Sequence, residues 1–156
     1  KALTLWQPWG TLVRARAKPW EFRGWRPPNS VIGARIGIHA GARPVKRPEI
    51  EDLLERLTSG TGGAWSTALI PEIAIPILER ALADPRSMPL SSMLCSAVVG
   101  EPKEGWKIAE ELGGPVNDSD REEHSNWGWP MLDVEPYEPI IPCRGMQGLW
   151  EWNGHG

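Results

Sequence analysis

The sequence predicts an α+β protein built on a small β-barrel of about six strands, with short flanking helices and a helical insertion. Two observations lead to this fold class. Short apolar or alternating segments lie before residue 41 and after residue 92, and the chain's 16 prolines and 17 glycines separate them with turns. Between these segments, over residues 44–90, apolar residues recur at helical spacing. Since 156 residues suit one core, we expect a single domain spanning 1–156.

The strands expected before the insertion are short. Residues 2–5 form an apolar segment, and Pro8 then stands where a helix could begin. Residues 20–23 are expected to be extended, and residues 32–40 alternate in the manner of a strand. A barrel could use all three segments as neighbouring strands.

Helical spacing marks the insertion. Apolar residues from Ile50 to Leu57 predict a helix that Pro48 opens and Gly60 closes. A second helical pattern, over residues 70–78, contains Pro76. Because proline lacks an N–H and clashes with the preceding turn, we expect two short pieces or a kink there.

β-type patterns return after the insertion. Residues 94–99 predict a buried strand, and residues 127–134 predict another, which Pro130 would confine to an edge or a bulge. Residues 117–126 form a polar loop, and residues 148–152 a last strand. Between these last two strands the chain is expected to be broken by three prolines, Pro136, Pro139 and Pro142.

Several classes of protein are disfavoured. The chain has no apolar run near the roughly 20 residues that a membrane helix needs, and no charged segment leads an apolar core as in a secretory signal. Cys95 and Cys143 are too few for a disulfide scaffold, and the three histidines are far apart in sequence. We therefore expect no metal, no cofactor, no membrane partner, and a cytoplasmic location.

Charge is distributed unevenly along the chain. Residues 1–48 hold ten Lys and Arg residues against one acidic residue, a net charge of +9. The remainder holds seven basic and nineteen acidic residues, a net charge of −12, so the total is −3. Such a basic block favours a surface that faces a polyanion. Alternatively, acidic residues from later segments fold across it and neutralise it.

Lys18, Glu21 and Arg23 form the most distinctive cluster. In an extended segment Glu21 and Arg23 point to one face. Glu21 could accept a hydrogen bond from a base or act as a general base, and Arg23 suits a phosphate. Lys18, which we expect to be exposed, could hold a phosphate or act as base or nucleophile. The alternative is a structural ion pair between Glu21 and Arg23.

Tryptophans accompany this cluster. Aromatic rings among cations suit base stacking. We expect Trp6 and Trp25 to be exposed as a stacking surface and Trp9 to lie in the core, while Trp127 and Trp129 could close the site from the other side. The interleaved residues are Trp6, Trp9, Trp20 and Trp25 with Arg14, Arg16, Arg23 and Arg26.

These motifs resemble the ASCH domain, a member of the PUA-like β-barrel superfamily. Lys18, Glu21 and Arg23 match the family signature G-x-K-x-x-E-x-R, with Arg16 in place of its glycine. The resemblance covers about two-thirds of the chain and leaves out the helical middle. The other similar segments are residues 3–9, 35–40, 95–100 and 142–150.

The resemblance implies a PUA-like barrel that binds nucleic acid, and RNA above all. The partner would be RNA, another nucleic acid or a nucleotide. His39, at a strand end, could reach the site or serve a structural role. The expected nucleic-acid-binding residues are Trp6, Arg16, Lys18, Glu21, Arg23, Trp25, Arg26, His39 and Trp127.

Two other functions stay open. ASCH relatives include amidohydrolases of acetylated cytidine and ribonucleases, so Lys18 and Glu21 could be catalytic, with a second carboxylate from Glu122 or Glu123, or Ser125 in that role. The deacetylating relatives carry a hydroxyl residue where this chain has Glu21, and this difference argues against deacetylation. The third function is an interaction domain whose helical insertion docks another protein.

Overall fold

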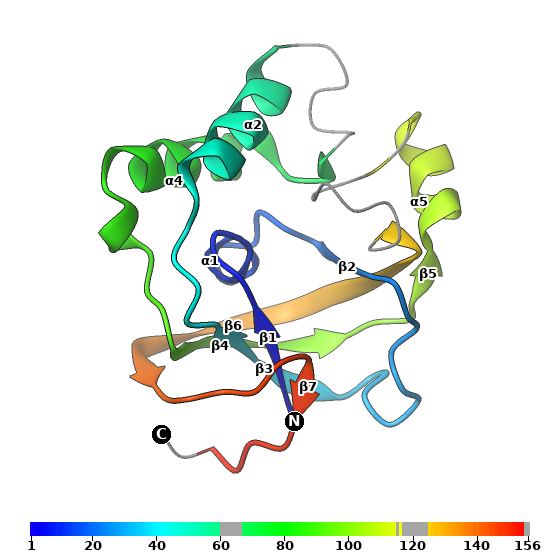
Figure 1. The fold of residues 1–156 in the computed structure, drawn as a ribbon. Helices are drawn as coiled ribbons and strands as arrows, with labels where there is room; N and C mark the ends of the chain where they lie inside the picture. Colours follow the sequence, from blue (N-terminus) through cyan, green and yellow to red (C-terminus); the bar gives the residue numbers. More distant parts are fainter. Residues whose placement is uncertain (60–66, 115, 117–124, 155–156) are drawn as a thin grey trace.

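The computed structural model describes residues 1–59, 67–114, 116 and 125–154, and shows an α+β fold. A curled sheet forms a half-barrel, and helices cover one side of it (Figure 1). The predicted fold class is therefore confirmed. The strands are β1 (Ala2–Leu5), β2 (Trp20–Arg23), β3 (Arg35–Ala40), β4 (Ser92–Val99), β5 (Lys103–Glu104), β6 (Trp127–Pro142) and β7 (Leu149–Trp150).

Six strands follow one path through the sheet, in the order β2-β6-β4-β3-β1-β7, and the two-residue β5 pairs with β6 beside it. The pairing of β1 with β3 is parallel, and the other strand pairs are antiparallel. β2 and β7 are thus the two ends of the path. No ladder joins these ends in the described part of the chain, so the barrel is open along β2.

The helices between β3 and β4 form the expected insertion. α2 (Arg47–Thr58) matches the prediction. α4 (Pro71–Ala83) is one continuous helix that contains Pro76, so of the two alternatives expected there, two short pieces was wrong, and a kink stays a prediction. Pro76 forfeits one backbone hydrogen bond, but α4 buries Ala74, Leu78 and Ala81 against α2 and α1, and this packing outweighs the loss. The turn η1 (Pro85–Ser87) follows α4.

β6 continues for 16 residues through the prolines that were expected to break it, so that prediction was wrong. The reason lies in two irregularities of its ladder with β4, between Met93 and Cys95 and between Ser96 and Val98. Pro139 falls inside the first irregularity, where no N–H is needed for the ladder.

Arginine side chains satisfy the carbonyl groups left unpaired at these irregularities. Arg14, at the end of α1 (Trp9–Arg14), donates from Nε to the Leu94 carbonyl at 3.1 Å and from Nη2 to the Tyr137 carbonyl at 2.9 Å. Arg16 donates from Nη2 to the Val134 carbonyl at 2.6 Å. These cations of the basic block therefore bind protein backbone, which buried carbonyl groups require.

Three apolar clusters hold the fold together. The first fills the inside of the curl and includes Leu3, Ile38 and Trp129. The second lies between α1 and the insertion helices (Figure 1). The third joins β2 to α5 (Gly105–Leu112), a helix that the sequence analysis did not predict. Of the helices described, none has the length and apolar character to cross a membrane.

Candidate nucleic-acid interface

Glu21 and Arg23 lie on the inner face of the curl at its open edge. The register of β2 with β6 places Glu21 opposite Trp129 and Arg23 opposite Trp127. Glu21 is only 7% exposed, and its Oε1 lies 3.4 Å from Arg23 Nε. The ion pair considered from the sequence is thus present.

Arg23 also spans the opening of the barrel. Its Nη2 donates to the Thr4 carbonyl of β1 at 3.1 Å. Among the described strands β2 has a ladder with β6 alone, so this hydrogen bond ties its outer side to the opposite end of the sheet. Arg23 therefore has a structural role. Its side chain is 21% exposed, so only the part of the guanidinium that reaches solvent can contact a ligand.

Lys18 is buried, with an exposure of 2%, so the expectation that it would be exposed was wrong. Its ammonium lies 5.3 Å from the centre of the Phe22 ring. Phe22 belongs to the third cluster, on the side of β2 opposite Glu21 and Arg23. A buried ammonium beside an aromatic face is stabilised by the ring quadrupole, and this contact is one of those that hold the lysine within the fold.

Trp25 is the best-placed aromatic surface. It follows β2, is 42% exposed, and meets the fully buried Trp129 edge to face, with ring centres 4.9 Å apart. Trp129 Nε1 also donates to the Trp25 carbonyl at 3.1 Å. Backbone and ring of Trp25 are therefore both fixed by one core residue, although the ring itself reaches solvent.

Other predicted tryptophans take different positions. Trp6 is exposed, as expected, but the Arg43 guanidinium lies 4.1 Å from its ring centre. Trp127 is partly buried and packs on the first cluster. Trp9 packs against the second cluster, as expected. The exposed tryptophan that stands beside Glu21 and Arg23 in the chain is therefore Trp25.

The basic block is largely neutralised. Seven of its ten cations form ion pairs with acidic residues that the structure describes, six of them with residues beyond position 48. This arrangement matches the alternative interpretation of the charge asymmetry and leaves a smaller cationic surface than +9 suggests. The seven are Lys1, Arg14, Arg23, Arg26, Arg35, Arg43 and Arg47.

His39 belongs to a separate cluster on the other side of β1. Its Nδ1 lies 3.1 Å from Thr4 Oγ1, and its Nε2 lies 2.9 Å from the carbonyl of Cys143. Trp150 packs edge to face on the imidazole and donates from Nε1 to Thr4 Oγ1 at 2.9 Å. With both ring nitrogens engaged, His39 holds the segment before β7 against the sheet, the structural role considered from the sequence.

Neither cysteine is placed as a nucleophile. Burial raises the pKa of the Cys95 thiol to about 12, so it stays protonated at neutral pH. Burial also raises the pKa of Cys143. Within the described ranges, no group of three His, Cys, Asp or Glu residues is arranged to hold a metal ion.

Some predicted residues cannot be placed at the site. Glu122 and Glu123 lie outside the described residues. Ser125 is described, and its hydroxyl is buried without a hydrogen bond to a described residue. Arg26, in contrast, follows Trp25 directly in the chain, is exposed, and pairs with Glu101 at 3.7 Å. Conversely, the anchoring of Trp25 by Trp129 was missed, since nothing in sequence spacing joins residues 104 positions apart.

No protein-family model and no curated protein matches this chain. The geometry of the site is therefore the basis for inferring its function.

Proposed function

We propose that this chain is an ASCH-like module that binds single-stranded nucleic acid, RNA above all, at the surface formed by Glu21, Arg23, Trp25 and Arg26. The observation that carries the proposal is the exposed ring of Trp25, fixed by Trp129 beside the Glu21–Arg23 ion pair. A ring that is already immobile loses little conformational entropy when a base stacks on it.

Arg26 supplies a contact for the nucleic-acid backbone. Its partner Glu101 is a highly exposed residue at 3.7 Å, and exposed pairs of this kind contribute little free energy. A phosphate can therefore replace Glu101 at low cost. Since most other cations of the N-terminal block are paired, the strand would make only one or two phosphate contacts.

The few phosphate contacts define the expected salt dependence. Each phosphate neutralised on a single strand contributes about −0.7 to the slope of log affinity against log salt. We expect a slope of about −0.7 to −1.4, shallower than that of a protein bound across an extended polyanion.

Trp25→Ala is expected to weaken binding of a labelled ten-nucleotide single-stranded RNA by about five- to a hundred-fold, because one stacked base is worth about 1–3 kcal/mol. Fluorescence anisotropy titrations measure this change. Trp106→Ala is the matched control, since Trp106 is 61% exposed on α5 and is not one of the residues of the proposed surface. Equal affinities for wild type and Trp25→Ala would contradict the proposal.

Burial of Lys18 and Glu21 favours a second candidate, an enzyme acting on RNA or on a modified nucleoside. Charged side chains this well buried are more typical of catalytic groups than of phosphate contacts. Glu21 would act as a general base on a base or nucleoside bound at Trp25. Product formation from labelled RNA or from N4-acetylcytidine would favour the enzyme if the Glu21→Gln variant no longer forms the product. The absence of product at high protein concentration would exclude an enzyme for both substrates.

A further inference from the structure

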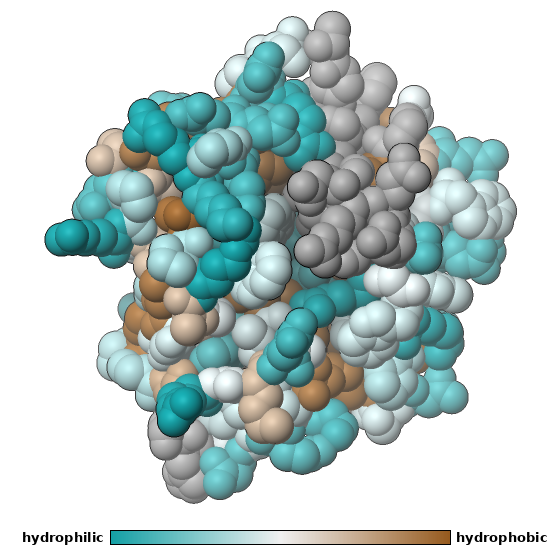
Figure 2. All heavy atoms as spheres, in the orientation of Figure 1, coloured by the Kyte–Doolittle hydropathy of each residue, from teal (hydrophilic) through white to brown (hydrophobic). Residues whose placement is uncertain are grey.

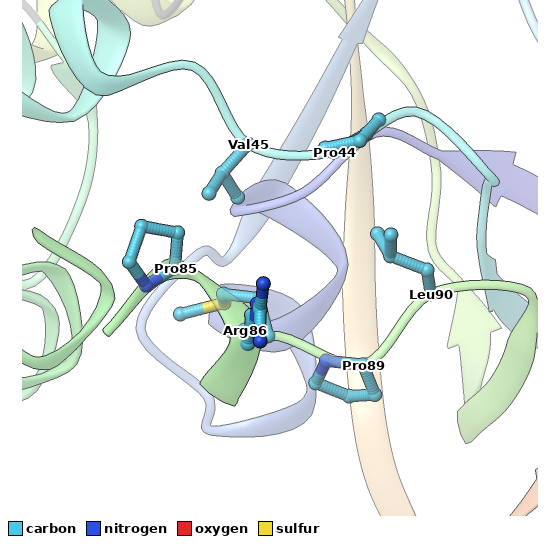
Figure 3. Close-up of a pocket in the computed structure, with 7 residues that line it drawn as sticks. Pro44, Val45, Pro85, Arg86, Pro89 and Leu90 are labelled. Carbon is cyan, nitrogen blue, oxygen red and sulfur yellow. The ribbon is translucent and has the colours of Figure 1, made fainter.

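An apolar groove lies where the segment leading from β3 into α2 meets the segment leading from η1 into β4 (Figure 3). Its volume is about 500 Å³. Figure 2 shows hydrophobic residues at the surface on this side of the molecule, below α4. The groove is lined by Pro44, Val45, Pro85, Arg86, Met88, Pro89 and Leu90.

The walls of this groove are held in place before any ligand arrives. Pro44, Pro85 and Pro89 have restricted φ angles and so limit the motion of both segments. The Pro89 carbonyl accepts a hydrogen bond from Nε2 of the buried Gln7 at 2.8 Å. Met88 is buried in the second cluster and anchors the floor. A preformed site of this kind binds with a small ordering cost.

The rim of the groove carries two cations, Lys46 and Arg86, that form no ion pair with a described residue. Arg86 lines the groove, and Lys46 follows Val45 directly. Both are exposed, and neither forms an ion pair with a described residue, whereas their neighbours Arg43 and Arg47 are paired with Glu49 and Glu51. The unpaired cations thus flank the apolar lining and favour an anionic ligand there.

We propose that this groove docks a segment of a partner protein in which an apolar side chain is flanked by Asp or Glu residues. Aliphatic and proline side chains accept an apolar anchor, and Lys46 and Arg86 complement acidic residues on either side of it. The groove offers no aromatic ring for a base to stack on, so the lining favours a peptide over a nucleic-acid strand. This inference is independent of RNA binding at Trp25.

The test uses a phage-displayed library of random twelve-residue peptides, panned against the full chain. We expect enrichment of peptides that carry Leu, Phe or Trp next to acidic residues. The double variant Lys46→Glu with Arg86→Glu should lower the affinity for an enriched synthetic peptide about ten-fold or more in anisotropy titrations. The reason is that both residues would then repel the acidic residues of the peptide. Arg80→Glu, a single charge reversal of the same kind at an exposed residue of α4, should leave the affinity unchanged.

Four outcomes would overturn the proposal. They are the absence of any enriched peptide, enrichment of basic peptides, an affinity that the double variant leaves unaltered, and displacement of the peptide by the ten-nucleotide RNA. Sedimentation that shows a dimer dissociated by the double variant would assign the groove to a second copy instead. Trp25→Ala should still bind the peptide, so failure of the two proposals can be told apart.

Discussion

Trp129→Ala is expected to lower the free energy of unfolding by about 3–5 kcal/mol, the range for removing a buried aromatic residue from a core. Trp129 is fully buried within the first cluster, and its indole N–H is satisfied by the Trp25 carbonyl. The alanine leaves a cavity and also frees Trp25. For a domain whose whole stability is about 5–15 kcal/mol, this loss removes a large part of it.

Urea denaturation followed by circular dichroism measures the change. Trp106→Ala serves as the control, since its exposed ring should contribute within about 0.5 kcal/mol. A Trp129→Ala variant as stable as wild type would show that this residue does not organise the curl. Weaker RNA binding by a variant that still folds would agree with the role of Trp129 in fixing Trp25.

Gly105→Ala is expected to destabilise the protein by about 1–3 kcal/mol or more, as overpacking does. A Cβ at this position would lie 1.7 Å from the backbone oxygen of Ser125. The Gly105 N–H also donates to the Asn126 carbonyl at 2.8 Å, so neither segment can move away without losing this bond. Alanine's better helix propensity, at most about 1 kcal/mol, does not offset a clash with backbone.

Gly114→Ala provides the matched control for that substitution. No heavy atom lies within 4 Å of the Cβ that alanine would add there. Thermal melts should show a clear decrease in melting temperature for Gly105→Ala and little change for Gly114→Ala. Equal melting temperatures would mean that the chain before β6 does not pack on the start of α5.

Local sequence patterns, which depend on residues close together in the chain, predicted the fold well. β1, β2 and α2 lie where local patterns placed them: β1 is an apolar segment that is buried along most of its length, and α2 buries the one face that its helical spacing marks. The errors arose where tertiary structure changes the local rule. β6 tolerates its prolines because arginines from the end of α1 complete the irregular ladder, and no local pattern shows this. α5 is only eight residues long and begins at a glycine with no capping side chain, so the sequence carries no clear signal for its start.

The site was harder to predict than the fold. The spacing of Glu21 and Arg23 correctly indicated a shared face. The burial of Lys18 and the anchoring of Trp25 depend on contacts with segments that are distant in sequence. The charge of the N-terminal block also depends on residues distant in sequence, because its ion pairs extend to Glu138 and Glu151. Composition gives the total charge but not the partners.

The prolines of β6 have a consequence for association between molecules. Beyond Pro130, β6 is paired only with β4 among the described strands, so its other side is a sheet edge. An edge with a complete row of donors can recruit a strand from another molecule. Three of the last seven residues of β6, Pro136, Pro139 and Pro142, have no N–H to offer. The residues that made this strand hard to recognise therefore also make the open barrel a poor template for aggregation.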